Sequence, residues 1–83
     1  MPDTQQAPSP LAALETPADY QAARAAIFPS RESLRWFVRR NRNRLADLGA
    51  IVAPAGSMLI DRERMDRAVA AIGRERVGGR ESA

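Results

Sequence analysis

The residues with the clearest chemical potential in this 83-residue chain are six arginines between positions 31 and 44. Only one acidic residue, Glu32, lies in that segment, whereas the rest of the chain carries seven arginines and nine acidic residues. In a helix, Arg31, Arg35, Arg39 and Arg42 would fall within an arc of about 80°. A separate, mainly apolar stripe would be formed by Leu34, Phe37, Val38, Asn41, Leu45 and Leu48. A helix with one apolar edge and one arginine edge suits a polyanionic ligand, and we expect nucleic acid.

The order of side chains along this helix predicts two kinds of contact with DNA. Guanidinium groups bond bidentately to guanine O6 and N7, and recognition helices turn their N-terminal halves toward the bases. We therefore expect base or groove contacts from Arg31, Ser33, Arg35 and Arg39. Phosphate contacts, which release counterions, are expected from Arg40, Arg42, Asn43 and Arg44. The alternative is a solvated basic face without a ligand, in which six like charges are offset only by Glu32.

Other polar and aromatic residues have both a structural and a functional interpretation. Trp36 lies off the apolar stripe, and we expect it to pack under the hairpin or the first helix rather than to stack on a base. Asn41 interrupts the apolar stripe, which favours a structural role with backbone partners. Ser57, beside Gly56, is a candidate phosphate contact, although a tight turn needs the same residues. Local pairing on a solvated surface is expected where Arg62, Arg64 and Arg67 alternate with Asp61, Glu63 and Asp66.

Composition excludes several classes of function. The chain has no Cys and no His, which removes the usual zinc sites, thiol nucleophiles and imidazole bases. Its acidic residues show no spacing typical of a metal site or an acid–base pair, and so small a core has little room for a catalytic cleft. We expect no enzymatic activity, no metal and no cofactor. No apolar run approaches the roughly 20 residues that cross a bilayer and no secretory signal is recognisable, so we expect a soluble cytoplasmic protein.

A small domain must position these side chains. The pattern predicts a mainly α-helical domain with a small β-hairpin at residues 16–73, between a flexible N-terminal arm (1–15) and a flexible basic tail (74–83). The hairpin is predicted from two short apolar runs, residues 51–53 and 58–60, about a turn that contains Pro and Gly.

Three helices are expected in this domain. Their predicted capping residues are Thr16, Ser30 and Asp61. Their predicted ends are Ile27, Leu48 and Gly73, with Gly49 in a left-handed conformation after the second helix. Only Phe28, Pro29 and Ser30 would separate the first two helices, and so short a connection is typical of a helix-turn-helix.

The sequence resembles the minimal winged helix-turn-helix of excisionase-like and MerR-like DNA-binding modules. The motif that carries the resemblance is Ser30-Arg31-Glu32-Ser33-Leu34-Arg35-Trp36-Phe37-Val38-Arg39, followed by the hairpin and its adjoining helix. The resemblance covers about residues 17–73 and implies that the helix starting near Ser30 enters the major groove while the hairpin wing touches a minor groove. It also implies a small accessory protein of a phage, plasmid or integrated element. The longer second helix and the absence of basic residues at the hairpin tip depart from this pattern.

These observations together predict a sequence-specific double-stranded DNA-binding protein, either a recombination directionality factor or a small transcriptional regulator of a mobile element. A homodimer or a cooperative oligomer on DNA is compatible with the sequence. One alternative is a protein-interaction module, such as a phage-encoded inhibitor or an antitoxin-like partner. Another is an architectural or RNA-binding protein without sequence preference.

Overall fold

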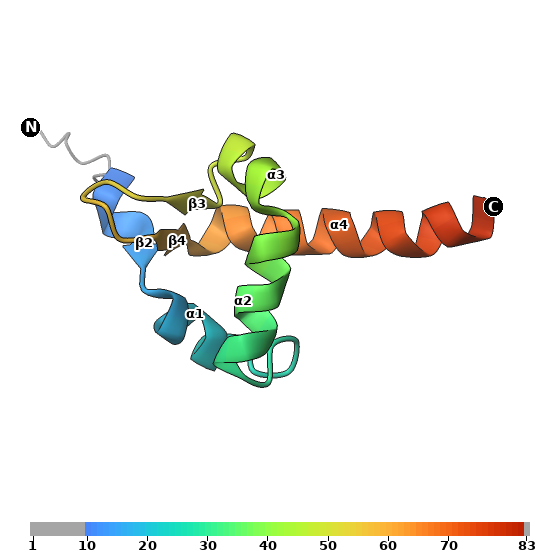
Figure 1. Ribbon diagram of the computed structural model, residues 1–83, viewed down its shortest axis with the longest axis horizontal. Helices are drawn as coiled ribbons and strands as arrows, with labels where there is room; N and C mark the ends of the chain where they lie inside the picture. Colours follow the sequence, from blue (N-terminus) through green and yellow to red (C-terminus); the bar gives the residue numbers. More distant parts are fainter. Residues whose placement is uncertain (1–9, 83) are drawn as a thin grey trace, which may run out of the picture.

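The computed structural model describes residues 10–82, with side chains for residues 11–78. The fold is mainly helical, with one small antiparallel sheet. Its elements are η1 (Pro10–Ala13), β2 (Leu14–Glu15), α1 (Pro17–Ala23), α2 (Arg31–Arg40), α3 (Arg42–Asp47), β3 (Ile51–Val52), β4 (Leu59–Asp61) and α4 (Arg62–Ser82). In Figure 1, α2 crosses α4, the sheet lies at the N-terminal end of α4, and the C-terminal part of α4 extends beyond the other elements.

The three predicted helices, α1, α2 and α4, begin where the sequence predicts, because a side chain caps each of these starts. The Thr16 hydroxyl accepts a hydrogen bond from the Asp19 amide at 3.1 Å, with Pro17 in the first turn of α1. The Asp61 carboxylate likewise accepts from the Arg64 amide at 3.0 Å at the start of α4.

The predicted hairpin is present, and a third strand extends it. β3 pairs with β4 in the antiparallel register Ile51 to Ile60. On the other edge of β4, β2 pairs antiparallel with Leu14 opposite Asp61, so the sheet order is β2-β4-β3. The predicted flexible arm is therefore wrong for residues 10–15, which form η1 and β2; residues 1–9 lie outside the described part of the chain. Pairing between segments so far apart in sequence leaves no local signal.

The core lies between the sheet, α1, α2 and α4. It consists of Tyr20, Phe28, Leu34, Val38, Leu45, Ala50, Ile51, Ile60, Met65, Ala68 and Ile72. Phe28 packs edge-on against Phe37, with ring centroids 5.3 Å apart. The helix α1 ends at Ala23, and Phe28 is buried in the core. Residues 24–30 therefore form a longer connection than the three residues predicted. Ile27, the predicted end of the first helix, lies in this connection and is 56% exposed.

A hydrogen-bonded network joins α1 to α4. The Asp66 carboxylate accepts from Arg24 Nε at 2.9 Å and Nη2 at 2.6 Å, and from the Tyr20 hydroxyl at 2.7 Å. Hydrogen bonds from Arg24 and then Tyr20 lower the pKa of Asp66 against the opposing effect of its burial. Burial, together with Asp66, raises the pKa of Tyr20, which therefore remains a neutral hydrogen-bond donor. The network stabilises the position of α1 relative to α4.

Two glycines differ in their effect on the helices. Gly49 has a φ of +75° and follows α3, and the Ala50 amide donates to the Leu45 carbonyl at 2.9 Å, as expected of a left-handed helix end. Gly73, predicted to end the last helix, does not, because α4 continues to Ser82. The predicted flexible tail is accordingly helical through residue 82.

Candidate nucleic-acid interface

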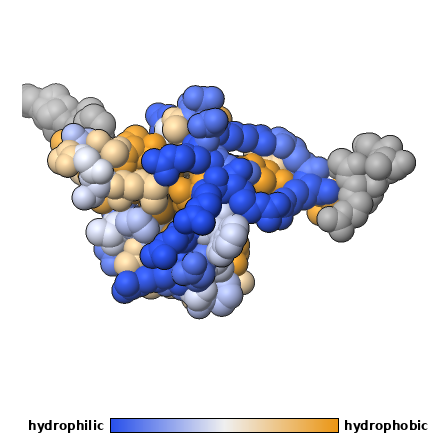
Figure 2. All heavy atoms as spheres, in the orientation of Figure 1, coloured by the Kyte–Doolittle hydropathy of each residue, from blue (hydrophilic) through white to orange (hydrophobic). Residues whose placement is uncertain are grey.

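A groove of about 400 Å³ runs along α2. The apolar residues in its lining are Pro17 and Ala18 from α1, Leu34 and Val38 from α2, and Met58 from the hairpin. Its basic residues are Arg31, Arg35 and Arg39 from α2 and Arg42 from α3, which we call the arginine row. The four arginines that the sequence places in one arc thus border one concave surface. Figure 2 shows strongly hydrophilic side chains along α2 on one face of the molecule.

Two serines form the start of α2, on which the arginine row depends. The Ser30 hydroxyl accepts from the Ser33 amide at 3.1 Å, and the Ser33 hydroxyl accepts from the Ser30 amide at 3.2 Å. The Ser33 hydroxyl also donates to the Ser30 carbonyl at 2.6 Å. These three bonds form a capping box in which a serine takes the place of the more usual Glu or Gln. Ser33, predicted to contact a base, therefore has its hydroxyl engaged in capping the N-terminal end of α2.

The arginine helix is interrupted at Asn41, so the prediction of one helix to Leu48 is wrong. The Asn41 side-chain amide donates to the Phe37 carbonyl at 2.9 Å, and its backbone amide is shared between the carbonyls of Phe37 and Val38. An Asn side chain that bonds to nearby backbone competes with helix continuation. The predicted structural role of Asn41 is confirmed.

The residues after the interruption separate into different environments. Arg42 stays with the arginine row. Arg44 instead forms two hydrogen bonds to the Glu75 carboxylate on α4, which lowers the pKa of Glu75. Asn43 is exposed on α3 and does not line the groove. Among these predicted phosphate contacts, Arg44 is therefore the one whose charge is already compensated.

Ion pairing distinguishes the arginines of this protein. Outside the arginine row the pairs are Arg24–Asp66, Arg44–Glu75, Arg62–Glu15, Arg64–Asp61 and Arg67–Glu63. The local pairing predicted for α4 is confirmed for Arg64 and Arg67, while Arg62 reaches the strand β2. Within the row, Arg35 has only a 3.5 Å contact to Glu32, in which both side chains are 64% exposed.

Four further arginines have no acidic partner in residues 11–78, namely Arg31, Arg39, Arg40 and Arg42. Arg74 and Arg76, on the extended part of α4, also lack one among those residues. Arg40 is exposed on α2 and lies outside the lining of the groove. Uncompensated positive charge is thus concentrated on α2 and the first residue of α3.

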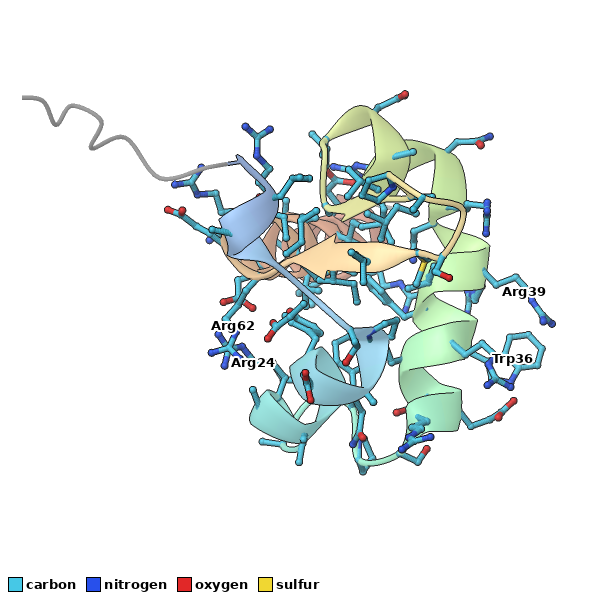
Figure 3. All side chains as sticks on the ribbon, turned by 90° about the vertical axis from the view of Figure 1, so that its left-hand side faces the viewer. Arg24, Trp36, Arg39 and Arg62 are labelled. Atoms are coloured by element: carbon cyan, nitrogen blue, oxygen red, sulfur yellow. The ribbon has the colours of Figure 1, made fainter. Side chains whose placement is uncertain are left out.

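The tryptophan of α2 is placed differently from the prediction. Trp36 is 53% exposed instead of packing under the hairpin or the first helix. The Arg39 guanidinium lies over its ring, 5.5 Å from the centroid. In Figure 3 both side chains extend from the same side of α2, away from Arg24 and Arg62. Their three-residue spacing is the signal from which this contact could have been predicted.

The hairpin contributes little beyond Met58 to this surface. Ser57 is exposed at the tip, where Gly56 has a φ of +98°, and Ser57 does not line the groove. The predicted phosphate contact at Ser57 therefore lies outside the groove that the arginine row borders. Residues that sequence reasoning missed are Pro17, Ala18 and Met58, which complete the groove by tertiary contact.

Other binding chemistries find less support. In the described part of the chain, no three His, Cys, Asp or Glu side chains form a group that could hold a metal ion. None of the described helices combines the length and apolar character needed to span a bilayer.

No family model matches the chain, and no curated protein and no solved structure is significantly similar to it. What the protein binds must therefore be inferred from its own side chains.

Proposed function

We propose that the chain is a sequence-specific double-stranded DNA-binding protein that inserts α2 into the major groove. The observation that carries the proposal is the distribution of ion pairs. Arg24, directly after α1, and the arginines of the N-terminal part of α4 are paired with carboxylates, whereas those along α2 and at the start of α3 are unpaired or loosely paired. Unpaired like charges gathered on one helix favour a polyanionic ligand, because their mutual repulsion is relieved when it binds.

The dimensions of α2 agree with this ligand. A helix with its side chains is about 10–12 Å wide, and the major groove of B-DNA is about 12 Å wide. The members of the arginine row on α2 are four residues apart, which separates them by about 6 Å along the helix axis. In this proposal the arginine row lies along the edges of the DNA major groove, while Arg40, on another side of α2, contacts a phosphate. Each phosphate contact releases counterions and adds affinity.

The surrounding elements support a winged helix-turn-helix arrangement. α1 and α2 would be the two helices of the motif, and the β3–β4 hairpin would be the wing. The start of α1 and Met58 of the hairpin border the same groove as the arginine row, so the elements that a winged helix turns toward DNA share one side of the molecule. The biological role proposed is that of a recombination directionality factor or a small transcriptional regulator of a mobile element, both of which use one DNA-contacting surface.

The test is fluorescence anisotropy with labelled duplexes, one from the region upstream of the protein's own coding sequence and one of random sequence. The double variant Arg35→Ala/Arg39→Ala is compared with the matched control Arg64→Ala/Arg67→Ala. Both variants remove two positive charges, but the control removes arginines that pair locally on α4. We expect specific binding to be lost in the first variant and retained in the control, with unchanged helix content by circular dichroism.

Each alternative outcome has a distinct meaning. Equal binding of the wild type to both duplexes would indicate an architectural protein without sequence preference. Equal loss in both double variants would show that total charge, rather than the arginine row, governs binding. Absence of binding to any duplex at low salt would refute the proposal and favour a protein partner, to be sought by nuclease-treated pull-down.

A further inference from the structure

Trp36 and Arg39 form a feature that general attraction to DNA does not require. Trp36 is the single tryptophan of the chain, and more than half of its surface is exposed. Among residues 11–78, the ring contact of Trp36 is with the Arg39 guanidinium. Figure 3 shows the two side chains lying side by side on α2. An exposed indole supplies no positive charge, so general attraction to phosphates does not account for it.

The contact distinguishes Arg39 from the other uncompensated arginines. In the described part of the chain, Arg31, Arg40 and Arg42 have neither an acidic partner nor an aromatic ring beneath the guanidinium. Arg35 is drawn toward Glu32 at 3.5 Å. Arg39 alone among these five has its guanidinium held by an aromatic ring. A guanidinium that lies over a ring keeps its in-plane N–H donors available for another partner.

Guanine is the base whose recognition needs this geometry. Its O6 and N7 acceptors lie side by side in the major groove and accept two parallel hydrogen bonds from one planar guanidinium fork. Phosphates also accept two bonds from one arginine, but they present acceptors in several directions and therefore tolerate more than one orientation of the fork. The loss of rotamer freedom on binding is smaller for a side chain that is already held in place.

Resting on the proposed DNA-binding function, we propose that Arg39 reads a guanine through O6 and N7 and that Trp36 is its positioning residue. Trp36 holds the guanidinium plane so that both donors meet the base edge together. The indole thereby contributes to sequence preference, while the unpaired arginines around it contribute affinity.

The test begins with a duplex selected by the wild-type protein from a random pool. Each guanine of that duplex is replaced in turn by adenine, which lacks the O6 acceptor, or by 7-deazaguanine, which lacks N7. At one guanine we expect adenine to weaken wild-type binding by roughly 5- to 160-fold, the discrimination of one bidentate pair. A smaller loss is expected from 7-deazaguanine at the same position.

Variants then separate positioning from structure. Trp36→Ala and Arg39→Lys should each lose the preference for guanine over adenine at that position and keep the preferences at other positions. Trp36→Phe should keep most of the preference at that position. Trp36→Ala removes no charge, so the salt dependence of its binding should equal that of the wild type. Because Trp36 is exposed, the thermal unfolding midpoint of Trp36→Ala should equal that of the wild type. In the wild type, saturation with the selected duplex should change the fluorescence of the single tryptophan.

Two results would overturn the inference while leaving the proposed function intact. One is full guanine discrimination by Trp36→Ala. The other is specific binding by the wild type with no change in Trp36 fluorescence, which would place the indole away from the DNA. Failure of the wild type to bind any duplex of the pool would overturn the proposed function and this inference together.

Discussion

Replacing Arg42 by alanine should reduce the salt dependence of DNA binding by one phosphate contact, whereas replacing Arg67 should not. The two substitutions change the net charge equally, and both side chains are exposed. They differ in that Arg67 pairs with Glu63 at 2.6 Å, while Arg42 borders the groove without an acidic partner in residues 11–78. Arg67→Ala is therefore a control for net charge.

The magnitude follows from the number of arginines on α2 and α3 that would contact phosphate rather than a base. If Arg31, Arg35, Arg40 and Arg42 each neutralise one phosphate, the logarithm of affinity should fall with the logarithm of salt with a slope of about −3.6. Between about 50 and about 200 mM salt the wild type would lose affinity by about 150-fold. Without Arg42 the slope becomes about −2.7 and the loss about 40-fold.

The assay is fluorescence anisotropy of one labelled duplex over a salt series for the wild type and both variants. The expected pattern is a reduced slope for Arg42→Ala and a slope equal to that of the wild type for Arg67→Ala. Equal reductions in both variants would mean that total charge, rather than the unpaired arginines of α2 and α3, sets the salt dependence. That result would refute the inference from ion pairing to DNA contact.

Three further predictions concern stability. Gly73→Ala should raise the free energy of unfolding by about 0.5–1 kcal/mol, because glycine weakens the interior of a helix that runs through this position. Gly49→Ala should lower it by about 1–2 kcal/mol, since a Cβ is strained at a φ of +75°. Asp66→Asn should lower it by about 1–3 kcal/mol at neutral pH through the weakened bonds to Arg24 and Tyr20. Because folding lowers the pKa of Asp66, the wild type should lose this stabilisation as the pH falls through that lowered pKa, and the difference from Asp66→Asn should narrow in acid.

Urea unfolding followed by circular dichroism measures all three variants. A loss of stability in Gly73→Ala would indicate that the last helix ends there, as the sequence predicts, and would contradict the extended α4. An unchanged stability of Gly49→Ala would contradict the left-handed helix end. For Asp66→Asn, a difference from the wild type that stays constant down to acid unfolding would exclude a contribution from the ionised carboxylate.

The sequence by itself determined the features that depend on residues close together in the chain. The caps at Thr16, Ser30 and Asp61, the left-handed Gly49 and the β3–β4 hairpin all involve residues a few positions apart. The arc of arginines was predictable for the same reason, because helical periodicity alone places side chains three and four residues apart on one side. The structure brings these arginines to one groove.

Tertiary structure alone decided which of the arginines are free to bind a ligand. Arg44 and Arg42 are two residues apart in the same basic segment, yet Arg44 is paired with Glu75 and Arg42 is not. Packing between distant segments also places Leu14 and Glu15 beside β4, and it leaves Trp36 exposed. Each outcome depends on which remote segment folds against a residue. Local propensity carries no information on that, because ion pairs, strand pairing and burial are settled only when the whole chain has packed.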